Sequence, residues 1–141
     1  MLKRLMLVTA LVALLLVACG GGGGSTPPAI QLVVNEQPVS GFTGSYCWNR
    51  LCADAVPPEF DDLPLQSVSG PIILKADRPA PDRIFLSLST EVFGDQLGTL
   101  EVTDTDNVEW NTNLEPGIYI LSISAQWDKG DASYYYKIEI E

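Results

Sequence analysis

Apolar and polar residues alternate in short runs along most of the chain, from residue 29 to the end. A period of two is that of a β-strand with one buried face, and little of the chain has the 3.6-residue period of a helix. Eight runs therefore predict strands: 30–35, 41–48, 71–75, 83–90, 100–102, 108–110, 118–127 and 133–140.

The alternation also predicts which side chains share a face. The predicted sets are Phe42, Gly44, Tyr46 and Trp48; Ile84, Leu86 and Leu88; Tyr119, Leu121, Ile123, Ala125 and Trp127; and Tyr134, Tyr136, Ile138 and Ile140. Tyr135 lies between two members of the last set. It either points outward or belongs to a strand that is buried on both sides.

Turn residues separate these runs. Gly130 lies in the hairpin-sized connection 128–132, where a positive φ is expected, and Pro116-Gly117 predicts a turn before run 118–127. Only stretch 59–63 is permissive for a helix, and we expect at most one turn there. The chain from residue 29 to 141 is therefore predicted to be an all-β domain, an antiparallel sandwich of about seven to nine strands.

The first 19 residues have the three zones of an export leader. Lys3 and Arg4 are positive, residues 5–17 are apolar, and Cys19 follows Ala18. The apolar run is too short to span about 30 Å of hydrocarbon securely, so it favours a signal peptide over a permanent transmembrane helix.

The tetrapeptide Leu16-Val17-Ala18-Cys19 resembles the bacterial lipobox. In bacterial lipoproteins the thiol of this cysteine receives diacylglycerol and the bond before it is cut. The resemblance implies a signal peptide at residues 1–18, lipid on Cys19, and a protein anchored outside the cytoplasm on the cell membrane or outer membrane. Two acyl chains anchor a protein stably in a membrane, whereas a single chain gives only marginal binding. The alternative is an ordinary signal peptide with an incidental cysteine.

Residues 19–28 are predicted to be the lipidated cysteine and a tether. Five glycines at 20–24 are flexible, and Ser25, Thr26, Pro27 and Pro28 end the segment in a stiffer form. Nine residues of this kind would hold the domain about 16 Å from the membrane on average. An acidic residue directly after the cysteine would resemble an inner-membrane retention signal. Position 20 is a glycine, so this signal is absent.

Composition excludes several classes of function. Two of the 8 basic residues lie in the leader, so the remainder carries 6 basic and 18 acidic residues, a net charge of −12. That charge argues against binding nucleic acid, whose phosphates need Lys and Arg. The chain has no histidine, which excludes Ser-His-Asp and Cys-His catalysis and removes the commonest transition-metal ligand. No cofactor is predicted.

Cys47 and Cys52 enclose four residues. If these four form a hairpin loop, the two cysteines lie opposite each other and can form a structural disulfide, as expected in an oxidising compartment. A redox-active pair is the alternative, but the spacing is not that of CxxC oxidoreductases.

Two further groups are candidate sites. Asp104, Asp106 and Asn107 could supply oxygen ligands to Ca²⁺, although the spacing of an EF-hand is absent, and a polar turn is the alternative. Trp48, expected at an exposed loop tip, and Tyr135 are candidate ligand contacts, since exposed aromatic side chains stack on sugars or anchor proteins. Core packing is the alternative for both.

Residues 44–48 with Cys52-Ala53-Asp54, and the final stretch 114–140, resemble segments of uncharacterised bacterial lipoproteins and of Ig-like or fibronectin-like extracellular modules. The resemblance implies fold and location but no activity. We expect a non-catalytic binding or adhesion module whose partner is a protein or a glycan. An accessory subunit of an envelope complex, a protease inhibitor and a carboxylate-based hydrolase are the alternatives.

Overall fold

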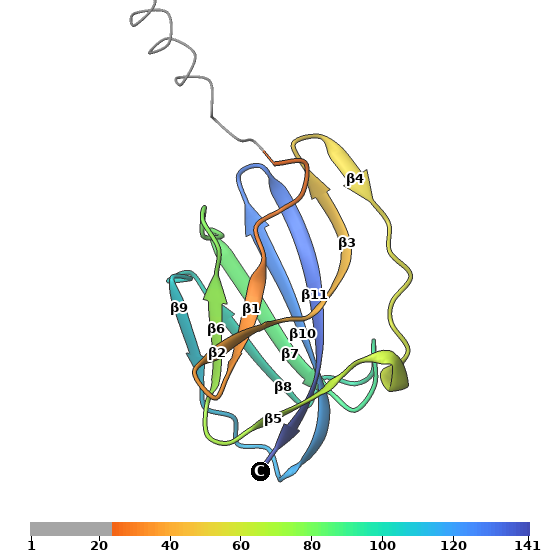
Figure 1. Ribbon diagram of the computed structural model, residues 1–141, viewed down its shortest axis with the longest axis vertical. Helices are drawn as coiled ribbons and strands as arrows, with labels where there is room; N and C mark the ends of the chain where they lie inside the picture. Colours follow the sequence, from red (N-terminus) through yellow and green to blue (C-terminus); the bar gives the residue numbers. More distant parts are fainter. Residues whose placement is uncertain (1–23) are drawn as a thin grey trace, which may run out of the picture.

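The computed structural model describes residues 24–141, which form two packed β-sheets (Figure 1). One short 3₁₀ turn, η1 (Phe60–Asp62), precedes the fifth strand. The strands are β1 (Ile30–Val34), β2 (Gln37–Ser40), β3 (Phe42–Trp48), β4 (Leu51–Ala53), β5 (Leu65–Val68), β6 (Ile72–Ala76), β7 (Arg83–Ser89), β8 (Gly98–Val102), β9 (Asn107–Trp110), β10 (Gly117–Trp127) and β11 (Gly130–Ile140).

The predicted fold class is confirmed, and each of the eight predicted runs is a strand. The predicted number of strands was too low, because the described residues contain 11. The three missed strands, β2, β4 and β5, have only 3 or 4 residues each. So short a segment shows too little alternation to be recognised from its own sequence.

The two sheets differ in size. One has the strand order β2-β1-β6-β9, and the other has β4-β3-β11-β10-β7-β8 with β5 beside β11. Strand β11 pairs along its whole length with β10, from Gly117↔Ile140 to Trp127↔Gly130. On its other edge, β3 pairs with the first half and β5 runs parallel to the second half, so β11 is a central strand throughout.

The main core lies between the two sheets. Its fully buried members include Ile30, Leu32, Ile72 and Leu74 from the smaller sheet and Ile84, Leu86, Leu88, Leu121, Ile123 and Ile138 from the larger one. Tyr136 links the two sheets, because its hydroxyl donates to the Ile30 carbonyl over 2.6 Å and accepts from the Leu32 amide over 3.2 Å. Every buried polar group of this tyrosine is thereby paired, as a core requires.

Strand β3 contains an irregularity that changes its faces. Tyr46 lies opposite Ala132, but Thr43 lies opposite Tyr134, so β3 has one residue more than β11 across this interval. Such a bulge inverts the alternation. Phe42 therefore packs with Tyr135 on the outer face, while Trp48 belongs to the inner core.

The prediction that Phe42, Gly44, Tyr46 and Trp48 share one face was wrong for this reason. A methyl group added at Gly44 would lie 2.7 Å from Cε2 of Tyr135, so Gly44 is also turned to the outer side. Tyr46 packs against the inner core. An alternating pattern alone cannot show where a bulge inserts a residue.

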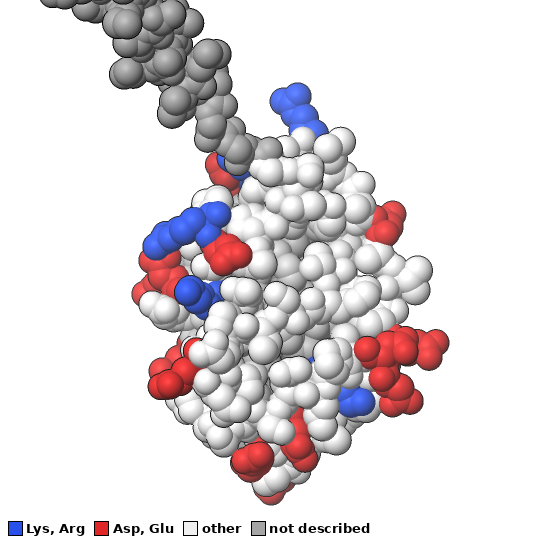
Figure 2. Space-filling model, viewed as in Figure 1, with Lys and Arg blue, Asp and Glu red and all other residues white. Residues whose placement is uncertain are grey.

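The β3–β4 and β10–β11 turns lie at the end of the sandwich where residue 24 is found, and the C-terminus lies at the opposite end (Figure 1). On the face drawn in Figure 2, acidic side chains are spread over the whole length of the domain, whereas most basic side chains lie nearer the end opposite the C-terminus. Glu139 and Glu141 lie at the C-terminal end, because β11 finishes there.

Candidate functional site

The predicted signal peptide, Cys19 and residues 20–23 lie outside the described residues, which begin at Gly24. The rest of the predicted tether is attached to the sandwich. Trp48 donates from Nε1 to the Gly24 carbonyl over 3.1 Å, and the Tyr134 hydroxyl donates to the Pro28 carbonyl over 2.7 Å. Two rings of the large sheet thus hold the chain before β1 begins at Ile30.

Trp48 is buried, and the prediction that it is exposed was wrong. Its side chain is 3% exposed and packs edge-on to Trp127, with ring centroids 5.4 Å apart. Because Trp48 pairs with Leu51 across a turn of only two residues, it belongs to the strand and not to the loop tip. It is therefore a core residue and is not available for a ligand.

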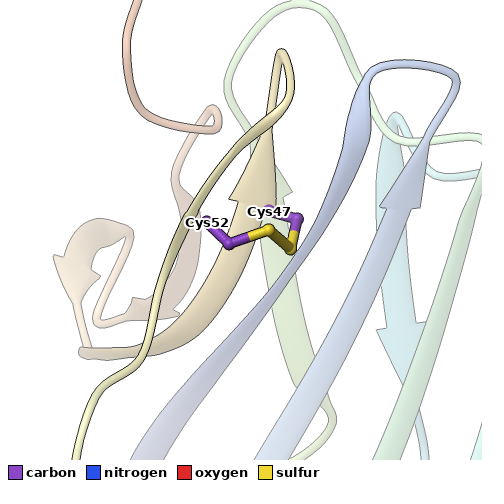
Figure 3. The surroundings of a disulfide bond; sticks show 2 residues. All are labelled: Cys47 and Cys52. Carbon is purple, nitrogen blue, oxygen red and sulfur yellow. A yellow bond between two sulfur atoms is a disulfide. The ribbon is translucent and has the colours of Figure 1, made fainter.

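The predicted disulfide between Cys47 and Cys52 is confirmed (Figure 3). The two cysteines are directly opposite each other on β3 and β4, and the loop between the strands is Asn49-Arg50. Both loop residues have positive φ, 48° and 68°, as a two-residue hairpin turn of this kind requires. The bond closes the short β3–β4 hairpin at the edge of the larger sheet.

The structure gives two of the three calcium candidates other partners. Asp106 is 3.1 Å from Arg78 in an exposed ion pair, and Asn107 is the first residue of β9, opposite Lys75. Within residues 24–141, no group of three or more acidic, cysteine or histidine side chains could hold a metal ion. Asp104 and its neighbours are a polar connection between β8 and β9.

Tyr135 lies on the outer face of the larger sheet, and the strand that carries it is buried on both sides. Its ring is 8% exposed and packs with Leu63, Ile120 and Phe42 in a second hydrophobic cluster. Of the two alternatives for this residue, the doubly buried strand is confirmed. Segment 59–64 covers part of the outer face and makes that burial possible.

A groove of about 190 Å³ opens beside Tyr135 on this outer face. Its floor comes from β7, β10 and β11, and its wall comes from the β7–β8 loop. We call it the serine groove, and its lining residues are Phe85, Ser87, Ser89, Phe93, Gly94, Gln96, Ser122, Ile123, Ser124, Ser133 and Tyr135. The register explains the serines, because Ser122 lies directly between Ser87 on β7 and Tyr135 on β11.

Phe93 forms the wall of the serine groove and is the most exposed aromatic group in it. Its side chain is 77% exposed, and its backbone has a φ of 61°, a conformation that costs energy for a bulky residue. The ring stands edge-on to Tyr135, with centroids 6.4 Å apart and an angle of 82°. The unusual backbone angle and the exposed ring together make Phe93 a candidate contact residue of the groove.

Hydrogen bonds hold the loop that carries Phe93. The Ser89 hydroxyl donates to the Glu91 carbonyl over 2.6 Å, and the Gly94 amide donates to the same oxygen over 3.0 Å. At the end of the loop, the Leu97 amide donates to the Leu88 carbonyl over 2.8 Å. These hydrogen bonds fix the conformation of the loop and with it the position of Phe93.

The serine groove is polar but uncharged. Its lining, all within the described part of the chain, has hydroxyl and amide groups between the rings of Phe85, Phe93 and Tyr135 and includes no acidic or basic side chain. Burial raises the pKa of Tyr135 above 10.0, although a hydrogen bond with Ser133 opposes the shift, so its hydroxyl is neutral at ordinary pH. Such a surface can exchange hydrogen bonds and stack on apolar faces.

Sequence reasoning missed Phe93 and the serine set. A signal was present, because Ser87 and Ser89 alternate with core leucines in one predicted strand, and Ser122 and Ser124 alternate with core residues in another. Nothing in the pattern showed that these two strands are neighbours. Phe93 lies in a loop without periodicity, and only its backbone angle and exposure identify it.

Comparison of the chain with protein-family models, with curated proteins and with solved structures finds no significant match. No helix in residues 24–141 is both long enough and apolar enough to cross a membrane.

Proposed function

We propose that this protein is a lipid-anchored module that binds a ligand outside the cytoplasm, without catalytic activity, and that the serine groove is its binding surface. The observation that carries the proposal is the exposed ring of Phe93, held by a hydrogen-bonded loop above a polar floor. Binding would offset the cost of that exposure, because apolar surface removed from water contributes about 25 cal/mol per Å².

The anchor in this proposal is the lipobox-like sequence that ends at Cys19, and the arrangement of the domain supports it. Residue 24 lies at one end of the sandwich, and the C-terminus lies at the other (Figure 1). Most basic side chains lie nearer the tethered end (Figure 2). Anionic lipid headgroups attract basic side chains, so this end would face the membrane and the C-terminal end would point away from it. The groove, on a side of the sandwich, would then be open to a partner.

We also place the domain among Ig-like or fibronectin-like extracellular modules. The two-layer arrangement and the long β10–β11 hairpin support this assignment, together with the disulfide expected in an oxidising compartment.

The anchor is tested by growing cells with radioactive palmitate and comparing the wild-type chain with Cys19→Ser. We expect label and membrane association in the wild type and neither in the variant, because serine offers no thiol to acylate. Equal labelling of both proteins, or a wild-type chain that is unlabelled and freely soluble, would contradict the anchor.

The binding surface is tested by immobilising the full chain and passing separated protein and polysaccharide fractions of the host envelope over it. We expect one fraction to be retained by the wild type and to be lost with Phe93→Ala. Leu51→Ala is the matched control, since Leu51 is 62% exposed but outside the groove. Retention that is equal on all three proteins would show that the groove is not the binding surface.

A further inference from the structure

We propose that the ligand of the serine groove is a neutral carbohydrate chain, an inference that rests on the proposed binding function. One sugar ring would place its apolar face against Phe93, and its hydroxyls would exchange hydrogen bonds with Ser122 and Ser124. A sugar ring has both an apolar face and a rim of hydroxyl groups. The groove offers an aromatic ring for the first and serine hydroxyls for the second.

The charge of the lining favours a neutral ligand. The residues that form the groove include no Lys or Arg to pair with a phosphate, sulfate or carboxylate, and no Asp or Glu to pair with an ammonium group. Charged ligands need such partners because losing their hydration without compensation is costly. The net acidic surface of the domain would further repel an anion.

The position of the groove within the sheet disfavours an extended peptide. A peptide that adds a strand needs the free amides and carbonyls of a sheet edge. The floor here is formed by β7, β10 and β11, and each of these strands is paired on both sides. Strand β7 lies between β8 and β10, β10 lies between β7 and β11, and β11 lies between β10 and β3. The floor therefore offers side chains for contact and no free row of backbone amides and carbonyls.

Two serines of the floor, Ser122 and Ser124, have accessible hydroxyls, whereas Ser87 and Ser89 are buried. Ser124 is exposed and Ser122 is half-buried, and in residues 24–141 no buried side-chain oxygen or nitrogen lacks a hydrogen-bond partner. The hydroxyls of these two serines therefore do not need a ligand to be satisfied, since water can serve. A sugar that replaces this water must reproduce its hydrogen bonds, which a ring of hydroxyls does.

The size of the groove indicates how much of the ligand it holds. Its volume of about 190 Å³ is below the roughly 300–1,000 Å³ typical of sites for drug-sized molecules. It therefore accepts one ring, and the remainder of a chain would run along the open face of the sheet. Weak affinity for short oligosaccharides is expected from so small a contact.

The test uses the full chain in detergent and four neutral tetrasaccharides, of glucose in α and β linkage, of mannose and of N-acetylglucosamine, measured by calorimetry. Tetragalacturonate is the anionic comparison. We expect binding of at least one neutral sugar, a loss of about tenfold in affinity with Phe93→Ala, and a loss of about fivefold with Ser122→Ala. Leu51→Ala and Ser69→Ala, both outside the groove, should bind like the wild type.

Absence of binding by every neutral sugar at about 10 mM would overturn the inference, as would equal affinity of wild type and Phe93→Ala or tighter binding of tetragalacturonate. The envelope-retention experiment separates the two proposals. If retention depends on Phe93 but no neutral sugar binds, the ligand class is wrong and the binding function stands. If retention is also independent of Phe93, both proposals are wrong.

Discussion

The indole ring of Trp48 stands edge-on to the indole ring of Trp127, at an interplanar angle of 86°. Each ring also donates its N–H to a backbone carbonyl of a different segment, Trp48 to Gly24 and Trp127 to Pro79. The pair therefore joins the N-terminal segment and the β6–β7 connection to the two strands that carry the rings. Buried indoles with paired N–H groups contribute both apolar area and specificity.

Removing the Trp48 side chain should destabilise the domain and release the segment before β1. We expect Trp48→Ala to lower the free energy of unfolding by about 3–5 kcal/mol, because a large buried ring is lost. Trp48→Phe should cost less, about 1–2 kcal/mol, since it keeps a ring but loses the bond to Gly24. Denaturant unfolding measures the energies, and limited proteolysis at residues 24–28 reports the release. Val56→Ala, at a side chain 86% exposed, should change neither.

Two glycines with positive φ, Gly70 and Gly130, allow the cost of an unfavourable backbone angle to be compared with the cost of a steric clash. A methyl group at Gly130 would lie 1.9 Å from the Cys47 carbonyl oxygen, whereas one at Gly70 would meet nothing within 4 Å. Gly70→Ala should therefore cost about 1 kcal/mol through its backbone angle alone. Gly130→Ala should cost clearly more, because two paired strands must separate. Thermal unfolding of both variants checks the order, and equal costs would contradict the close contact between β11 and β3.

Loss of the Cys47–Cys52 bond should weaken the domain modestly. The bond joins residues separated by 5 positions, and a loop of that size gives roughly 2 kcal/mol by the loop-closure argument. The double variant Cys47→Ser, Cys52→Ser should therefore have a free energy of unfolding lower by that amount, measured with denaturant. It should retain the groove, which lies on other strands. Mass measurement after alkylation, with and without reductant, should find no free thiol at either position of the wild type purified without reductant.

Stability should fall at alkaline pH because of the buried tyrosines. Burial raises the pKa of Tyr134 and Tyr136 above 10.0, and for Tyr134 the charges of Tyr136 and Asp77 add to the shift. The unfolded chain loses these protons from about pH 10, while the folded chain retains them. The tyrosine contribution is thus complete below about pH 10 and is lost as the pH rises through the folded-state values.

The measurement is the free energy of unfolding from pH 8 to pH 12. Tyr134→Phe and Tyr136→Phe should each reduce the decline above pH 10. Both variants are less stable at pH 8, because Tyr134→Phe loses the hydrogen bond to Pro28 and Tyr136→Phe loses those with Ile30 and Leu32. Comparison with these variants separates the contribution of the two tyrosines from that of all other groups. A wild type and variants with parallel pH profiles would contradict the assignment.

The sequence by itself determined the fold class, because burial on one side of a strand enforces a period of two that is visible in the chain. It also predicted the positive φ of Gly130, the single helical turn and the pairing of Cys47 with Cys52. Each of these features depends on neighbours in sequence, so local chemistry is sufficient to specify it.

Only the tertiary structure decided which strands are neighbours and where the faces change. The bulge in β3 moved Phe42 to the outer face, a two-residue turn buried Trp48, and segment 59–64 covered part of the sheet beside Tyr135. The serine groove exists because β7, β10 and β11 are adjacent and a loop holds Phe93 above them. Such contacts between distant segments leave no periodic trace in sequence, because each strand records its own burial but not the identity of its partner.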